Sequence, residues 1–123
     1  MLLPLYLQVA HEFADLHDRS GRMKAKGVIR DVVTWPKSRQ YFHYRIKRRI
    51  VQDDLVDQFM AADENLSNSD AVAKLSSMVS GDFEDDKLVL SYFSDNEAAI
   101  QSAIGDVRKA AITAKIAELQ AML

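Results

Sequence analysis

The strongest constraint on the fold is the helical spacing of the apolar residues, which persists through most of the chain. Phe42, Ile46 and Ile50 follow one another at intervals of four, and the pattern continues one position out of phase to about residue 62. Residues at such intervals lie on one face of an α-helix. A stripe that drifts around the helix contacts more than one neighbour. The spacing predicts helices near 4–18, 36–61, 69–79 and 95–121.

Residues that start or stop helices agree with these ranges. Pro4 and Pro36 suit the first turn of a helix, where the missing amide hydrogen has no cost. Ser67 or Ser69 can cap the helix near 69–79. Ser94 to Glu97, with the sequence SDNE, has the spacing of a capping box for the last helix. The apolar stretch KLVLSYF at 87–93 is interpreted as a further short helix, because the polar turns beside it are too close for a paired strand.

One segment favours a strand. VIRDVV at 28–33 is dense in β-branched residues and is bounded by Gly27, a good residue for ending a helix, and by Trp35-Pro36. The expected fold is therefore mainly α, with about four to five helices and one short strand. A strand needs a partner for its backbone amides. VIRDVV is the one convincing strand of the sequence, so no second strand is predicted to pair with it.

Length and composition exclude several classes of protein. A chain of 123 residues suits one domain with a real core. The absence of cysteine excludes a disulfide scaffold, a thiolate zinc site and a cysteine nucleophile. No apolar run reaches the ~20 residues of a membrane-spanning helix. The apolar start of the chain lacks the basic region of a signal peptide.

The charge is distributed unevenly along the chain. Residues 1–50 contain eleven Lys or Arg and four Asp or Glu, whereas residues 51–123 contain five and fourteen. The two halves can neutralise each other, or the basic half can bind an anionic partner. The basic segment 35–49 alternates cations with aromatic residues, as nucleic-acid-binding helices do. The overall pI of about 5.9 argues against that function, and we expect no nucleic-acid partner.

Candidate catalytic and metal-binding motifs fail on spacing. His11 and His17 lie six positions apart, so they point to different faces of a helix and cannot chelate one zinc ion. The acidic run DFEDD at 82–86 lacks the glycine and terminal glutamate of a calcium loop, and we expect it to be a solvated charge run. We therefore predict no catalytic, cofactor-binding or metal-binding residue.

Residues 2–55 nevertheless resemble a known family. The strings FADLHD, KGVI at 26–29 and Trp35 with Ser38-Arg39, followed by Tyr44-Arg45 and Arg48-Arg49, are similar to the C-terminal stretch of the carboxyltransferase domain of eukaryotic, single-chain acetyl-CoA carboxylase. The resemblance implies that residues 1–62 are the end of a crotonase-like α/β core and that 63–123 are a variable helical tail. The family's A…G-ϕ-I-D-x-V element is matched by Ala25, Gly27, Ile29, Asp31 and Val33.

The resemblance also implies a function. The parent enzyme would transfer a carboxyl group from carboxybiotin to acetyl-CoA and give malonyl-CoA for fatty acid synthesis. This segment would be a structural and dimerisation portion that binds no cofactor and is inactive alone. Its partners would be the upstream carboxyltransferase domain and a second protomer, and its location the cytoplasm or a plastid.

An independent helical adaptor whose basic face binds an acidic protein is the alternative. In either case the candidate interface or anion-binding residues are basic. An arginine at an interface would need a carboxylate, for which residues 53, 54, 57 and 84–86 offer candidates. The basic residues are Arg19, Arg22, Lys26, Arg39, Arg45, Arg48 and Arg49.

Overall fold

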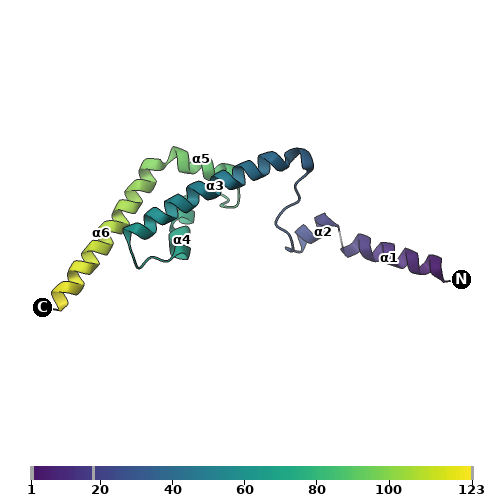
Figure 1. Cartoon of the computed structure of the whole chain (residues 1–123), viewed down its shortest axis with the longest axis horizontal. Helices are drawn as coiled ribbons and strands as arrows, with labels where there is room; N and C mark the ends of the chain where they lie inside the picture. Colours follow the sequence, from purple (N-terminus) through teal and green to yellow (C-terminus); the bar gives the residue numbers. More distant parts are fainter. Residues whose placement is uncertain (1, 18, 123) are drawn as a thin grey trace. The chain divides into compact units, whose positions relative to one another are not determined.

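The computed structural model describes residues 2–17 and 19–122, and that part of the chain forms six α-helices (Figure 1). The mainly α fold that the sequence predicts is confirmed. The chain divides into two compact units, residues 1–39 and 40–123. This division concerns packing within the chain, and the separation of an enzyme core from a tail at residue 62 stays a prediction. No helix of the described ranges has both the length and the apolar composition needed to cross a membrane.

The first unit contains two helices, α1 (Leu3–His17) and α2 (Ser20–Ala25). Pro4 lies in the first turn of α1, as expected. The apolar residues of α1 share a face but are not covered: Leu5, Val9 and Phe13 are 56%, 57% and 62% exposed. Position 18, the predicted end of this helix, lies outside the described residues.

Gly27 ends α2 in the way the sequence predicts. Its φ of +72° lies in the left-handed region that favours glycine. The backbone N–H of Gly27 donates to the carbonyl of Lys24 (3.0 Å), and that of Val28 donates to the carbonyl of Met23 (2.9 Å). These two bonds are the pair that defines a Schellman motif.

The predicted strand at 28–33 is wrong for the described chain, where this segment is irregular. A run of β-branched residues forms a strand only beside another strand, and the six described helices offer none. The amides of Val28 and Ile29 donate to the carbonyl of Met23 instead. Asp31 forms an ion pair with Lys24, 2.6 Å between carboxylate and ammonium, which holds the segment near α2.

The second unit is built from α3 (Trp35–Ala62), which begins before the division, and from α4 (Asn68–Met78), α5 (Asp86–Asp95) and α6 (Glu97–Ala121). Of the two predicted caps, Ser67 and Ser69, the structure has Ser67, whose hydroxyl accepts the N–H of Asp70 at 3.2 Å. The interpretation of 87–93 as a helix is also confirmed.

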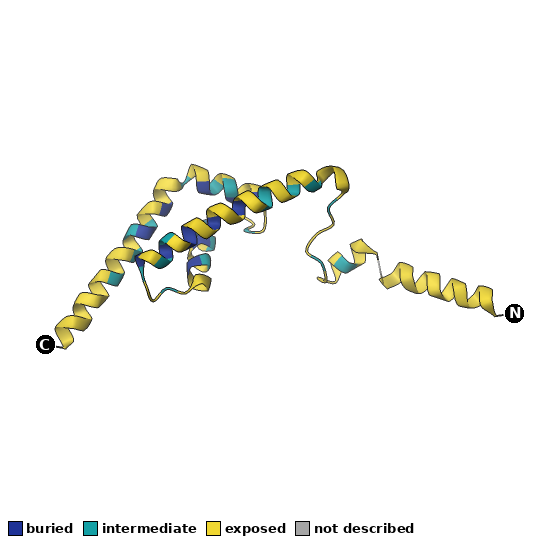
Figure 2. Ribbon diagram, in the orientation of Figure 1, coloured by how far each residue is buried: buried dark blue, intermediate teal, exposed yellow. Residues whose placement is uncertain are grey.

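The core of the second unit is formed by buried residues on all four helices, which are dark blue in Figure 2. Phe59 of α3, Leu75 of α4, Val89 of α5 and Ile100 of α6 are each at most 1% exposed. Each helix thereby buries one apolar face against the others, which is the main source of stability for such helices. The remaining members of the core are Leu55, Val56, Ala62, Ala71, Val79, Phe93 and Ile104.

Two details of the second unit differ from the sequence-based expectation. The capping box is not formed: Ser94 lies inside α5, and Asn96 precedes α6 without a side-chain cap. The Asn96 amide instead donates to the carbonyl of Tyr92 (3.0 Å) and so helps to end α5. The apolar stripe of Phe42 and Ile46 is also solvent-exposed rather than buried.

Candidate functional site

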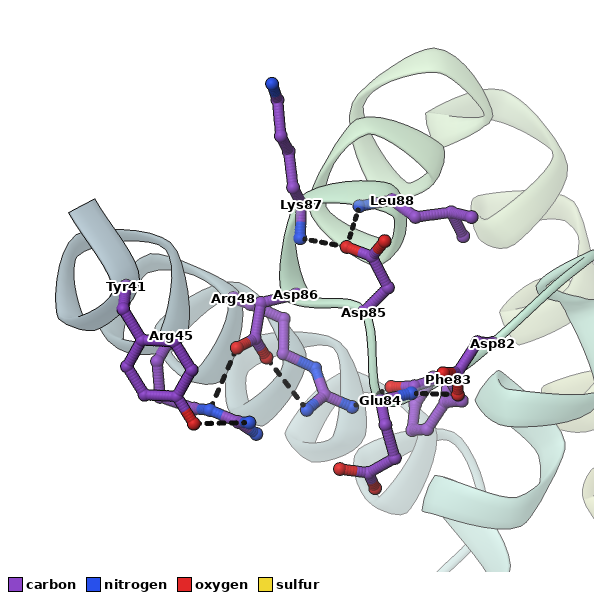
Figure 3. Close-up of polar contacts among 10 residues, drawn as sticks. All are labelled: Tyr41, Arg45, Arg48, Asp82, Phe83, Glu84, Asp85, Asp86, Lys87 and Leu88. Atoms are coloured by element: carbon purple, nitrogen blue, oxygen red, sulfur yellow. Dashed lines mark hydrogen bonds and ion pairs between the residues drawn. The ribbon is translucent and has the colours of Figure 1, made fainter. Parts of the chain in front are cut away.

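The start of α5 brings an acidic side chain back onto α3 (Figure 3). Asp85 caps α5, since its carboxylate accepts the N–H groups of Lys87 (3.0 Å) and Leu88 (3.1 Å). Asp86 therefore lies in the first helical turn, where the partial positive charge of the helix end favours a carboxylate. Asp86 is 8% exposed.

Two arginines of α3 share the carboxylate of Asp86. Arg45 Nε lies 2.9 Å from Oδ2, and Arg48 Nη1 lies 3.4 Å from Oδ1. They are three positions apart and hence neighbours on the helix surface. We call these three residues, with Tyr41 and Phe83, the Asp86 cluster.

The two aromatic members hold the guanidinium groups in place. Arg45 Nη2 donates to the Tyr41 hydroxyl at 3.4 Å. Arg48 Nη2 donates to the backbone carbonyl of Phe83 at 3.1 Å, and its guanidinium lies over the Phe83 ring, 4.6 Å from the ring centre. Arg48 thus binds both the loop before α5 and the first turn of α5. A cation over an aromatic face is attracted by the electron density of the ring.

The surroundings shift the pKa values of the two arginines in opposite directions. Burial acts to lower the pKa of Arg45, but the hydrogen bond with Tyr41 and the charge of Asp86 outweigh it and raise the pKa. Burial lowers the pKa of Arg48, and the charges of Asp86 and Glu84 offset this only in part. Arginine ordinarily titrates far above neutral pH, so both remain cationic there.

One donor and one acceptor of this region are buried without a hydrogen-bond partner within the described residues. They are Arg48 Nε and Gln52 Oε1, which belong to residues one helical turn apart on α3. Both residues are at most 4% exposed. A buried polar atom is usually paired with protein or water, so these two atoms are exceptions beside a well-paired cluster.

The acidic run at 82–86 is only in part the solvated charge run that we expected, because Asp82, Glu84 and Asp85 are exposed but the run also has structural roles. Asp86 is buried and ion-paired, and Asp85 caps a helix. Asp82 accepts the N–H of Glu84 at 2.8 Å within the preceding loop. The position of these residues directly before an apolar helical stretch was the available signal for a cap. Tyr41 precedes Arg45 by four positions on α3, which is the spacing of a local side-chain pair. The role of Phe83 had no comparable signal, because it depends on a tertiary contact with Arg48.

The other candidate cations are not members of the Asp86 cluster. Arg19 pairs with Asp15 at 3.0 Å on an exposed surface. Arg49 is exposed, one residue beyond the buried Arg48. The remaining three are exposed in the first unit: Arg22, Lys26 and Arg39.

The Asp86 cluster is suited to holding two helices together. Its cations are already bound to a carboxylate, a carbonyl and aromatic groups. In the part of the chain that the structure describes, no group of three or more His, Cys, Asp or Glu side chains is placed to hold a metal ion. The cluster therefore joins the start of α5 to the middle of α3.

The known proteins to which this chain is similar are much longer than it is. No protein-family model matches it. It is 38% identical over 97 residues to acetyl-CoA carboxylase of Saccharomyces cerevisiae, covering 77% of this chain and 4% of that protein. It is 37% identical over 117 residues to acetyl-CoA carboxylase of Dictyostelium discoideum, covering 88% and 5%. It is 50% identical over 72 residues to acetyl-CoA carboxylase 1 of Oryza sativa subsp. japonica, covering 58% and 3%.

Proposed function

The chain is homologous over most of its length to a short segment of eukaryotic acetyl-CoA carboxylases, and from this premise we propose that it is a C-terminal structural and dimerisation portion of the carboxyltransferase domain of such an enzyme. The observation that carries the proposal is the match itself, which covers 77% to 88% of this chain but only 4% to 5% of the two relatives. A segment of that size within a large enzyme is expected to pack against the rest of the polypeptide.

The exposed apolar surface supports a packing role. Leu5 and Phe13 of α1, Ile46 of α3, and Ile112 and Ile116 of α6 are each more than half exposed. Each belongs to a stripe at helical spacing, and a large exposed apolar patch marks a surface that contacts another protein surface or a ligand. The upstream carboxyltransferase domain and a second protomer are the partners we propose for these stripes.

We propose that this segment takes no part in the chemical steps of the parent enzyme. We propose that the parent moves a carboxyl group from carboxybiotin to acetyl-CoA, in the cytoplasm or in a plastid. The Asp86 cluster does not fit biotin or an acyl thioester, because its own side chains fill it and leave Asp86 only 8% exposed. The groups that would stabilise an enolate are expected upstream, so the role left for this segment is structural.

The test is a pair of variants in the full-length carboxylase that contains this segment. Arg48→Met removes a buried charge, and Lys74→Met removes an exposed charge of α4 as the control. A structural role predicts that Arg48→Met lowers the melting temperature or the dimer fraction, while the KM for acetyl-CoA stays within about twofold. A stable dimer whose KM for acetyl-CoA rises about tenfold, ~1.4 kcal/mol of binding, would instead indicate a contact with the substrate.

A further inference from the structure

The outward face of α3 carries a line of exposed apolar side chains. Phe42, Ile46 and Ile50 are 55%, 56% and 65% exposed. Their spacing of four places them in one row along the helix. The core residues Leu55 and Phe59 lie on the opposite side of α3. We call this row the α3 stripe.

Two cations border the α3 stripe. At about 100° per residue, Arg49 lies on one side of the row and Lys47 on the other. Both are exposed, and neither forms an ion pair anywhere in residues 2–17 or 19–122. The stripe is therefore an apolar row between two exposed positive charges, of which Arg49 has the acid Asp53 one helical turn further along. The stripe ends at Asp53, an exposed acid that follows Ile50 on the same face.

A groove lies beside the α3 stripe, on the side where Lys47 is found. It has a volume of about 550 Å³ and lies between α3, α5 and α6. Its lining includes Lys47 and apolar residues such as Ile50, Val51 and Phe93, and it also includes two acids, Asp54 and Glu97. A side chain from a partner that follows the stripe can enter this groove.

We propose that the α3 stripe, with Lys47 and Arg49, binds an acidic amphipathic helix supplied by the parent polypeptide outside these 123 residues. An apolar row between cations matches a helix whose apolar row lies between carboxylates. A second copy of α3 fits poorly, because pairing the two stripes about Ile46 would bring the unpaired cations of both copies together. That the helix comes from the parent polypeptide rests on the proposed function. The two relatives have room for such a helix, since 95% or more of each lies outside the segment that matches this chain.

The first test measures binding of a designed peptide to the 123-residue chain. The probe is an 18-residue helical peptide with leucines at helical spacing and glutamates beside them, and the control peptide replaces every glutamate by lysine. The surface predicts that the glutamate peptide binds at least about fivefold more tightly at low salt. Ile46→Ser should weaken binding, and Lys47→Glu with Arg49→Glu should reverse the preference between the peptides.

Matched control variants distinguish binding at this surface from non-specific binding of the peptide. Ile116→Ser removes an exposed isoleucine from α6, and Lys74→Glu reverses an exposed charge on α4; both should leave binding unchanged. All of these positions are exposed, and circular dichroism verifies that each variant folds. Equal binding of both peptides, or no effect of Ile46→Ser, would refute the surface. So would a dimer of the unliganded chain that Ile46→Ser abolishes.

The second test identifies the source of the helix in the parent enzyme. A photo-reactive phenylalanine at position 46 should form a cross-link to an acidic segment outside residues 1–123 of the same polypeptide. A cross-link to residues 1–123 of the second protomer contradicts the proposal. The peptide experiment does not depend on the identity of the parent, so its failure counts against the surface, whereas failure of the full-length carboxylase test counts against the proposed function.

Discussion

Arg48 and Asp86 are 38 positions apart in the sequence, yet their side chains meet at 3.4 Å while only 4% and 9% exposed. A charge removed from water is costly unless it is paired and hydrogen-bonded. Arrangements of α3 and α5 that separate the two residues are therefore disfavoured. The contact helps to fix the position at which α5 begins against α3.

Replacing Arg48 should destabilise the chain far more than replacing its neighbour. Arg48→Met leaves the carbonyl of Phe83 unbound and Asp86 with one arginine, and we expect a loss of about 2–4 kcal/mol in the free energy of unfolding. Arg49→Met, at an exposed position, should change it by less than about 0.5 kcal/mol. Urea denaturation followed by circular dichroism measures both, and equal effects would mean that the buried contact contributes nothing.

Asp85 and Asp86 are adjacent acids with different roles. Asp85→Ala removes a helix cap and should cost about 1 kcal/mol. Asp86→Ala leaves two arginines without their carboxylate and should cost about 3 kcal/mol or more. The order of the two unfolding free energies is the measurement, and the reverse order would contradict the assigned roles.

Two glycines should respond to alanine with opposite signs. Gly81 has a φ of +126°, and a Cβ atom there would lie 3.1 Å from Leu88 Cδ1, so Gly81→Ala should destabilise by about 1–2 kcal/mol. Gly105 lies inside α6 with no atom within 4 Å of an added Cβ. Gly105→Ala should stabilise by about 0.5–1 kcal/mol. Thermal melting of the two variants is sufficient to compare them.

The ion pair between Lys24 and Asp31 should make the pKa of the Asp31 carboxyl depend on Lys24. The hydrogen bond from Lys24, with that from the Val32 amide, lowers the pKa of the Asp31 carboxyl. The small stabilisation that results is present above the unfolded pKa of about 4 and is lost as pH falls through the lower folded value. Lys24→Met should raise the pKa of Asp31 toward its ordinary value. NMR titration of the carboxyl carbon would show no change if the contact does not form in solution.

The isolated chain should be inactive in the reverse half-reaction of the proposed parent. Malonyl-CoA decarboxylation in the presence of biotin needs groups that stabilise an enolate, and we assign none to this chain. The measurement is release of carbon dioxide by purified protein. Turnover that a single substitution in residues 1–123 abolishes would contradict the non-catalytic assignment.

The sequence predicts the helices well because their signals are local. The cap at Ser67 and the stop at Gly27 depend on residues within one turn of each helix end, as the structure confirms. The strand at 28–33 depends on a distant partner, which local composition cannot supply. The capping box predicted at Ser94 fails for a similar reason. Burial of Phe93 in the core accompanies a longer α5, which includes Ser94, and local spacing does not reveal that burial.

The candidate site could be predicted only in outline. The charge pattern indicates that the arginines of α3 need carboxylates and that residues 53, 54, 57 and 84–86 can supply them. It does not select Asp86, because that choice depends on how the cap at Asp85 orients the next residue toward α3. The exposed α3 stripe had the spacing of a core stripe, and spacing alone does not say whether a neighbour is present to cover it.

The bond between Arg48 and the Phe83 carbonyl also limits where the chain can change in length. The loop from Ser80 to Asp85 is fixed at one end by α4, at the other by α5, and in between by this bond to α3. An inserted residue on either side of Phe83 would shift the carbonyl or the start of α5 away from the guanidinium. The turn at Glu64 and Asn65 is exposed and is not held by the Asp86 cluster. Homologous chains that differ in length should therefore carry their insertions between α3 and α4, and keep the α4–α5 loop constant.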